Sequence, residues 1–128
     1  MMEPVWVTEQ LVLMIHDMLL AEHGGLSGIR DKSLLNSALA KPQQLYHYKP
    51  ESTLHELATM YSFGLVKNHP FIDGNKRIAF TATAVFLELN NKVLNAPEAE
   101  VVVLYEGLAS GKINKEVLAQ WLASNSTE

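Results

Sequence analysis

The chain has 128 residues, of which 48% are hydrophobic and 19% are charged. This length holds one compact domain with a single hydrophobic core, and the composition excludes a disordered chain. The formal net charge of −4 argues against broad nucleic-acid binding, which is typical of basic domains. We therefore expect one domain over residues 1–128 that makes no direct contact with nucleic acid.

The sequence contains no cysteine, which excludes disulfides and thiolate metal sites and fits a reducing compartment. Its first ten residues lack the basic segment and apolar core of a secretion signal. The longest apolar runs are too short or too interrupted to span a bilayer. These features predict a cytoplasmic protein that does not associate with membranes.

The first two of six expected helices lie in the N-terminal third of the chain. The first runs from an N-cap at Thr8 to the glycine pair at 24–25. Its predicted apolar face comprises Leu11, Met14, Ile15, Met18 and Leu19. The second has Asp31 as its N-cap and is expected to end before Pro42, because the residue before a proline disfavours the helical conformation.

Two segments around the second helix do not fit a helical pattern. The stretch HGGLSGIRD has three glycines in nine residues, which predicts a structured turn fixed by Arg30 and Asp31. Between Pro42 and Pro50 the aromatic residues alternate, as in a short hairpin or an extended edge.

The remaining helices have clear start and stop signals. The third opens with a capping box from Thr53 to Glu56. The fourth, from about Gly74 to Leu89, is apolar nearly all round, which predicts a place at the centre of the bundle. The fifth starts near residues 95–97 and ends at 111, and the sixth starts at 114. The tail SNSTE behind the sixth is expected to fray.

Residues 69–77 read HPFIDGNKR and place Lys76 and Arg77 in the first turn of the fourth helix. The N-terminus of a helix carries a partial positive charge, so each cation there costs about 0.3 to 1 kcal/mol. A bound phosphate would balance this charge and accept hydrogen bonds from the unpaired N–H groups. The placement therefore predicts an anionic ligand.

Two residues in this stretch suit catalysis and metal binding. His69 can accept a proton near neutral pH, because the ordinary pKa of histidine is about 6.5. Asp73 is a hard oxygen ligand of the kind that binds Mg²⁺ together with phosphates. The structural alternatives are a capping or core histidine and an aspartate that caps the fourth helix. The other four histidines have no metal-ligand spacing, so we expect them to be structural or at the surface.

The next four residues suit the binding of phosphate. Gly74 permits close approach of the backbone, and Asn75 can bond phosphate or sugar oxygens. Lys76 and Arg77 supply positive charge, which is the main protein contribution to phosphoryl transfer. The alternative is that Lys76 and Arg77 pair with acidic residues from other helices.

The stretch HPFIDGNKR resembles the Fic motif, HxFx(D/E)GNxR, in the form found in the death-on-curing (Doc) toxin subfamily. Lys76 stands where the general Fic pattern has glycine, and Phe80 stands where it has a further arginine. Both departures are typical of Doc-like members. The segment HGGLSGIRDKSLLNSALAKPQ and the overall length are also similar to those of Doc proteins.

This resemblance implies an all-α, single-domain six-helix Fic-type bundle with a central buried helix. A short flap near Tyr46–Tyr48 would pair with the backbone of a target protein. Phe71 would point into the core and anchor the loop. The resemblance assigns His69 as the general base toward a target hydroxyl and Asp73 as the Mg²⁺ ligand. Residues 74–77 would form the anion-binding nest, with the two cations among them also stabilising the transfer.

The resemblance also implies a function. Doc-like members are associated with transfer of the terminal phosphate of a nucleoside triphosphate to a Ser or Thr of a translation elongation factor. A Doc-like toxin of a type II toxin–antitoxin system would use ATP or another nucleoside triphosphate with Mg²⁺, modify an elongation factor Tu-like protein, and be neutralised by a cognate antitoxin. Two alternatives remain: a Fic-type AMP transferase acting on a protein hydroxyl, and a catalytically inactive helical interaction module.

The family's self-inhibitory pattern, (S/T)xxxE(G/N), is echoed at Ser52 to Glu56. However, Leu57 follows the glutamate, and the capping box accounts for the same residues. We therefore expect no self-inhibition, so restraint would come from a separate antitoxin.

Overall fold

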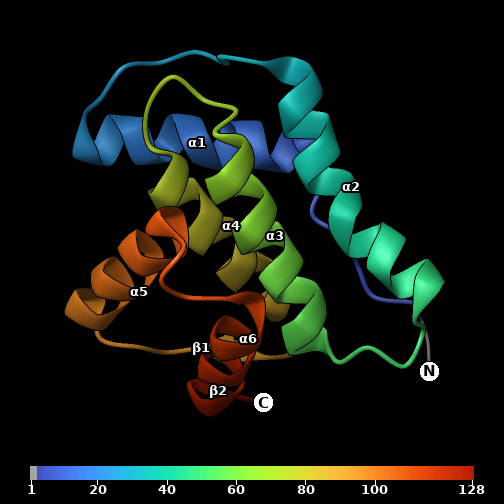
Figure 1. Ribbon diagram of the computed structural model, residues 1–128. Coiled ribbons are helices and arrows are strands. Elements are labelled where there is room, and N and C mark those ends of the chain that lie inside the picture. The colour runs from blue at the N-terminus through green and yellow to red at the C-terminus, as the bar shows by residue number, and fades with distance from the viewer. Residues whose placement is uncertain (1–2) are drawn as a thin grey trace.

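The computed structural model describes residues 3–128, and over this range the fold is a bundle of six helices (Figure 1). The helices are α1 (Glu9–His23), α2 (Lys32–Tyr48), α3 (Leu54–Asn68), α4 (Asn75–Leu89), α5 (Glu98–Ser110) and α6 (Lys115–Ser124). Two short strands, β1 (Val93–Leu94) and β2 (Ser126–Thr127), form an antiparallel pair. The predicted all-α class is confirmed. Within residues 3–128, none of the helices has the length and apolar content that crossing a membrane would require.

Helix α4 lies at the centre of the bundle, as predicted. It packs against α1, α3 and α5, and α3 runs beside it along the middle of the molecule (Figure 1). Its buried apolar residues are Ile78, Ala79, Ala82, Phe86 and Leu87. The six-residue loop 69–74 joins α3 to α4, so the carboxyl end of α3 and the amino end of α4 meet at one end of the bundle.

The predicted helix starts are confirmed where a side chain caps the backbone. The Thr8 hydroxyl accepts a hydrogen bond from the Leu11 N–H, and the Asp31 carboxylate accepts one from the Leu34 N–H. Helix α6 begins in the same way at Asn114. These caps use partners within three residues, which is why the sequence alone reveals them.

The predicted end of α2 before Pro42 is wrong, and so is the flap at Tyr46–Tyr48. Helix α2 continues through Pro42 to Tyr48. Pro42 is buried, and the Tyr46 ring packs edge-on against Trp6 with ring centroids 5.7 Å apart. Tertiary packing of α2 along the bundle thus outweighs the hydrogen bond that a proline removes from a helix.

Two further predictions are corrected. Met14 and Met18 lie on the solvent side of α1, with 60% and 64% of their surface exposed, because the buried stripe passes through Val12, Ile15 and His16. The tail after α6 does not fray at once: Ser126 and Thr127 pair with β1. A strand pairing across more than 30 residues is invisible to local sequence patterns.

Candidate active site

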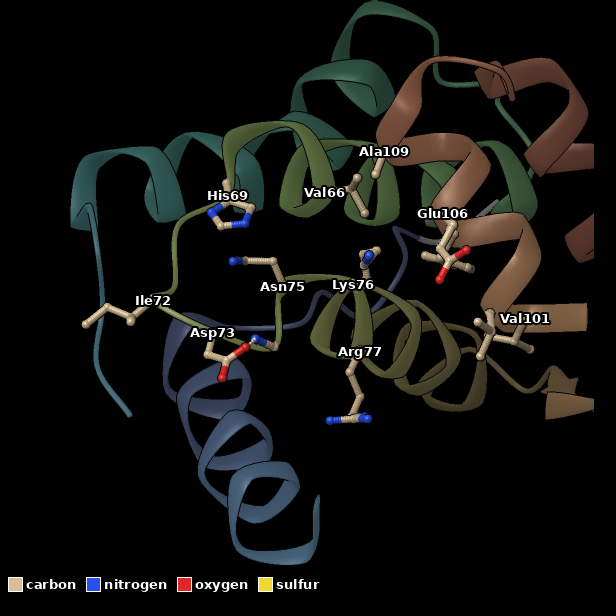
Figure 2. Close-up of a pocket in the computed structure, with 13 residues that line it drawn as sticks. Val66, His69, Ile72, Asp73, Asn75, Lys76, Arg77, Val101, Glu106 and Ala109 are labelled. Atoms are coloured by element: carbon tan, nitrogen blue, oxygen red, sulfur yellow. Dashed lines mark hydrogen bonds between the residues drawn. The ribbon is translucent and has the colours of Figure 1, made fainter. Parts of the chain in front are cut away.

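All the residues predicted for the site line one cavity at the junction of α3 and α4 (Figure 2). The cavity has a volume of about 510 Å³ and is closed on its far side by α5. The predicted residues in its lining are His69, Asp73, Gly74, Asn75, Lys76 and Arg77. The structure thus brings the six together, while the chemical role of each stays a prediction.

His69 is held in an unusual backbone conformation at the end of α3. Its φ of 51° and ψ of 54° are left-handed, which is uncommon for a residue other than glycine. Arg30 stabilises this turn: its Nε donates to the His69 carbonyl at 2.7 Å and its Nη2 donates to the Asn68 carbonyl at 2.8 Å. A cation that bonds the last carbonyls of a helix also complements the helix dipole.

This placement corrects the role expected for Arg30 and Asp31. Arg30 holds the carboxyl end of α3 through its side chain, and Asp31 caps α2. Their backbone N–H groups both donate to the carbonyl of Pro70. The segment after the glycines therefore runs alongside the 69–74 loop, where Ile29 and Phe71 form an isolated antiparallel bridge.

The loop is closed on itself by Asn75. The Asn75 side chain accepts a hydrogen bond from the Phe71 N–H and donates one to the Phe71 carbonyl, both at 2.9 Å. Asn75 is 5% exposed, and the Phe71 side chain is buried in the core, as expected. The Asn75 side chain therefore shapes the loop, and its predicted contact with a ligand stays a prediction.

The amino end of α4 lacks a side-chain cap. Gly74 is the N-cap residue in a left-handed conformation, and no side chain accepts a hydrogen bond from the first turn. The backbone N–H groups at the start of a helix have no partners within the helix. The alternative that Asp73 serves as the N-cap residue is not observed.

Asp73 is instead fixed beside the helix start. Its Oδ2 accepts a hydrogen bond from the Leu26 N–H at 3.1 Å, and its Oδ1 accepts one from the Gly74 N–H at 2.9 Å. The bond from Leu26 is the largest cause that lowers the pKa of the Asp73 carboxyl, followed by the bond from Gly74, and Arg77 adds to the effect. Asp73 is therefore ionised at neutral pH, as a metal ligand must be.

Lys76 and Arg77 are both exposed on the cavity wall. Within residues 3–128, neither of them lies within 4.0 Å of a carboxylate oxygen. The alternative that they pair with acidic residues from other helices is therefore not observed. Their positive charge is open to a ligand in the cavity.

The opposite wall comes from α5 and was not predicted from the sequence. Val101, Glu106 and Ala109 face the start of α4 across the cavity (Figure 2). Tyr105 anchors this wall: it is buried, its hydroxyl bonds to Ser62 on α3 at 2.6 Å, and burial raises its pKa to about 12. No local pattern marks these residues, because only the tertiary fold brings α5 to the site.

Comparisons with known proteins match the region that builds this site. The model of the Fic/DOC family matches residues 6–87, which include the whole 69–77 stretch. The chain is also similar to the protein named Toxin Doc from Mycolicibacterium smegmatis, with 38% identity over 74 residues. The aligned region covers 57% of this chain and 57% of that protein, so the match spans little more than half of the relative's length.

Proposed function

The chain belongs to the Fic/DOC family, and from this premise we propose that it is a Doc-like toxin of a type II toxin–antitoxin system. In this role it transfers the terminal phosphate of ATP or another nucleoside triphosphate to a Ser or Thr hydroxyl. The target is a translation factor resembling elongation factor Tu, and its modification blocks protein synthesis. A cognate antitoxin restrains the toxin.

The observation that carries this proposal is the uncapped, cationic start of α4 in the wall of the cavity. Lys76 and Arg77 have no acidic partner within residues 3–128, and the first N–H groups of the helix have no side-chain cap. Such a helix end favours a bound phosphate over water, because both the dipole and the free donors are satisfied. The cavity also has room beyond the helix start for the rest of a nucleotide.

The residues around this helix end have complementary roles in phosphate transfer. His69 accepts the proton of the target hydroxyl, whose oxygen attacks the terminal phosphorus as the bond to the nucleoside diphosphate breaks. Lys76, Arg77 and the N–H groups of α4 stabilise the charge on the phosphoryl oxygens. Asp73, ionised and exposed beside the helix start, would hold Mg²⁺, which would supply positive charge against the phosphates.

The opposite wall supports transfer of the terminal phosphate. A triphosphate whose outer end meets the cationic start of α4 leaves its nucleoside toward α5, where Val101 and Ala109 are apolar. The acidic Glu106 on that wall disfavours the phosphates there and can accept hydrogen bonds from ribose or base donors. In this orientation the terminal phosphate meets the start of α4, at the same end of the bundle as the 69–74 loop that carries His69.

The first test uses wild type, His69→Ala and Asp73→Ala with ATP labelled on the terminal phosphate and purified elongation factor. Each variant is expected to lower the transfer rate by at least about 100-fold, since removal of a general base or of the metal ligand removes a main catalytic contribution. Cells that express either variant should also show no toxicity. His47→Ala, which removes an exposed histidine at the end of α2, is the matched control and should keep full activity. Activity that survives either site variant would refute the mechanism.

The same assay separates the alternatives. AMP transfer would label the target from ATP carrying the label on the first phosphate and not on the last. An inactive interaction module would leave elongation factors unmodified in mass spectra of cells that express the protein.

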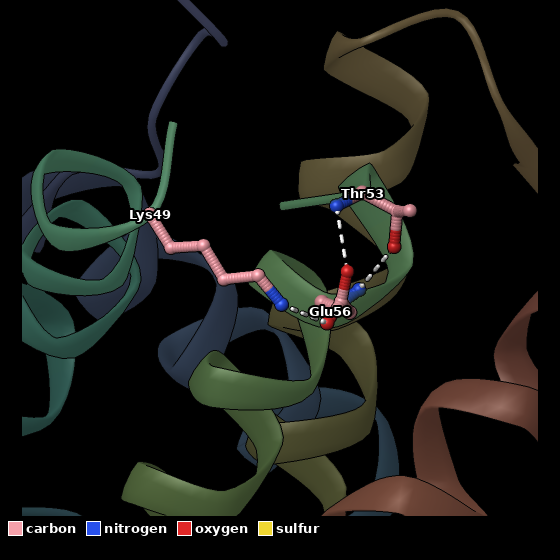
Figure 3. Close-up of polar contacts among 3 residues, drawn as sticks. All are labelled: Lys49, Thr53 and Glu56. Atoms are coloured by element: carbon pink, nitrogen blue, oxygen red, sulfur yellow. Dashed lines mark hydrogen bonds and ion pairs between the residues drawn. The ribbon is translucent and has the colours of Figure 1, made fainter. Parts of the chain in front are cut away.

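The need for an antitoxin is supported by the position of Glu56. Glu56 is part of the capping box of α3 (Figure 3), at the opposite end of that helix from His69. At 1.5 Å per residue the two are about 20 Å apart. Glu56 therefore cannot cover the start of α4, which agrees with restraint by a separate antitoxin. Co-expression with a short open reading frame from the same operon is expected to abolish toxicity.

A further inference from the structure

A buried histidine on α1 lies directly beneath the loop that carries the proposed site. His16 is 3% exposed, and its Nε2 lies 2.9 Å from the carbonyl oxygen of Asp73. Because a carbonyl oxygen can only accept, Nε2 carries the hydrogen and donates it. The His16 ring also stacks on Phe71, with centroids 3.8 Å apart and planes inclined by 15°. One side chain of α1 thus contacts the loop at two points.

The hydrogen bond from His16 fixes the peptide group that precedes α4. The Asp73 carbonyl and the Gly74 N–H belong to the same planar unit, and that N–H donates to Oδ1 of Asp73. A Cβ on Gly74 would lie 3.6 Å from Nε2, so the imidazole sits against the turn itself. Rotation of this peptide would move both the Asp73 carboxylate and the direction in which α4 starts.

Packing alone does not explain a histidine at this position. A phenylalanine would stack on Phe71 equally well and would bury no polar nitrogen. What the imidazole adds is one donor to the Asp73 carbonyl, a part-buried hydrogen bond that a phenylalanine could not make. The hydrogen bond to the loop, and not packing in the core, therefore explains why residue 16 is a histidine.

We propose that His16 is a positioning residue: through the Asp73 carbonyl it holds the metal-binding carboxylate and the start of α4 in the arrangement that receives a magnesium-bound triphosphate. His16 is absent from the cavity lining, so it acts through Asp73 and not by touching the ligand. This inference rests on the proposed function, and it adds a residue from outside the 69–77 stretch to the machinery of the site.

Three variants separate the hydrogen bond from the stacking. His16→Phe keeps the ring and removes the donor. His16→Gln keeps a donor and removes the ring. Phe71→Leu removes the stacking partner and leaves the His16 bond in place. Each purified protein is examined by thermal unfolding and by calorimetric titration with ATP, once with Mg²⁺ and once with EDTA, followed by measurement of KM and kcat for phosphate transfer.

A positioning role predicts a loss that depends on magnesium. His16→Phe should remain folded and lose about 10- to 100-fold in affinity for MgATP, since small displacements of a binding group have effects of this size. Its affinity for ATP in EDTA should fall less than threefold, because Asp73 then has no ion to hold. His16→Gln should recover most of the MgATP affinity. Phe71→Leu keeps the donor on His16, so any loss of ATP affinity that it causes should be the same with and without Mg²⁺.

Several outcomes would overturn the inference. MgATP affinity of His16→Phe equal to that of the wild type would leave His16 as a core residue only. An equal loss with and without Mg²⁺, or a His16→Gln as weak as His16→Phe, would indicate general loosening of the loop. If His16→Phe does not fold, the MgATP affinities of His16→Gln and Phe71→Leu are compared instead. An affinity of His16→Gln below that of Phe71→Leu would then contradict the inference. A wild-type protein that binds no MgATP would instead defeat the proposed function.

Discussion

The amino ends of α3 and α4 differ: α3 begins with a capping box, and α4 begins without a side-chain cap. Both helices have 15 residues. At α3 the Thr53 hydroxyl accepts from the Glu56 N–H at 3.1 Å and Glu56 Oε1 accepts from the Thr53 N–H at 2.9 Å, with Lys49 3.8 Å from the other carboxylate oxygen (Figure 3). At α4 the N-cap is a glycine, the first turn has no acid, and two cations take its place.

We propose that this difference separates a helix start that contributes to stability from one that binds a ligand. A glycine N-cap costs only a few tenths of a kcal/mol relative to threonine, and each cation at this end costs about 0.3 to 1 kcal/mol, so α4 forgoes roughly 1 to 2 kcal/mol that α3 keeps. An amino end without a side-chain cap, at the centre of the fold and open to a cavity, is therefore better explained by ligand binding than by folding.

The largest effect is expected when α4 is given the residue that α3 has at the same position. Arg77 is the third residue of α4, as Glu56 is of α3, so Arg77→Glu places an anion where the phosphate is proposed to bind. We expect MgATP affinity to fall at least about 100-fold, from the loss of a cation and the gain of a repulsive charge. The free energy of unfolding should stay unchanged or rise by up to about 1 kcal/mol, because an acid suits the helix dipole.

Calorimetric titration and urea unfolding of the same samples measure both quantities. Arg77→Gln should give an intermediate loss of affinity. Lys112→Glu, an equal reversal of charge on an exposed lysine away from the cavity, should leave the affinity unchanged. Full affinity in Arg77→Glu would contradict the view that the start of α4 is a phosphate site.

A smaller effect is expected at the carboxyl end of α3, which Arg30 satisfies. Arg30→Ala removes two charged hydrogen bonds to the last carbonyls of α3 and frees the left-handed turn at His69. We expect unfolding to become easier by about 1 to 2 kcal/mol and the transfer rate to fall about 10-fold, because His69 is less well oriented. Urea unfolding measures the change in stability, and the phosphate-transfer assay measures the change in rate.

Arg30→Lys should recover part of the stability and little of the rate, since an ammonium lacks the planar guanidinium fork that bonds both carbonyls. A rate unaffected in Arg30→Ala would show that His69 needs no such support.

The sequence predicted the helix starts well because the relevant contacts are local. Thr8, Thr53 and Asn114 each cap a helix through a partner three residues away. The predicted site is compact for a similar reason: its residues are almost contiguous, so one loop and one helix start bring them together. The anionic ligand was inferred from charge at a helix end, which requires only the boundary of α4 to be right.

What the sequence could not predict depends on distant partners. His16 and Asp73 are 57 positions apart, and Arg30 and His69 are 39 apart. Pro42 signals the end of a helix locally, yet packing carries α2 past it to Tyr48. The α5 wall has no motif of its own, so only the packed bundle places Glu106 opposite Lys76.

The smallest effect is expected from Glu56→Gln, which weakens the cap of α3 without touching the site. We expect a loss of about 0.5 to 1 kcal/mol in unfolding free energy at pH 7 and no change in MgATP affinity or transfer rate.

The hydrogen bond from the Thr53 backbone, helped by Lys49, holds the pKa of Glu56 below its ordinary value of 4.5. Stability from the ionised group is therefore present above pH 4.5 and is lost as the pH falls through the lowered pKa. The difference between wild type and Glu56→Gln in urea unfolding should shrink from pH 7 to pH 3. Tighter MgATP binding by Glu56→Gln would mean that this carboxylate does restrain the site, and the separation between the two helix ends would no longer hold.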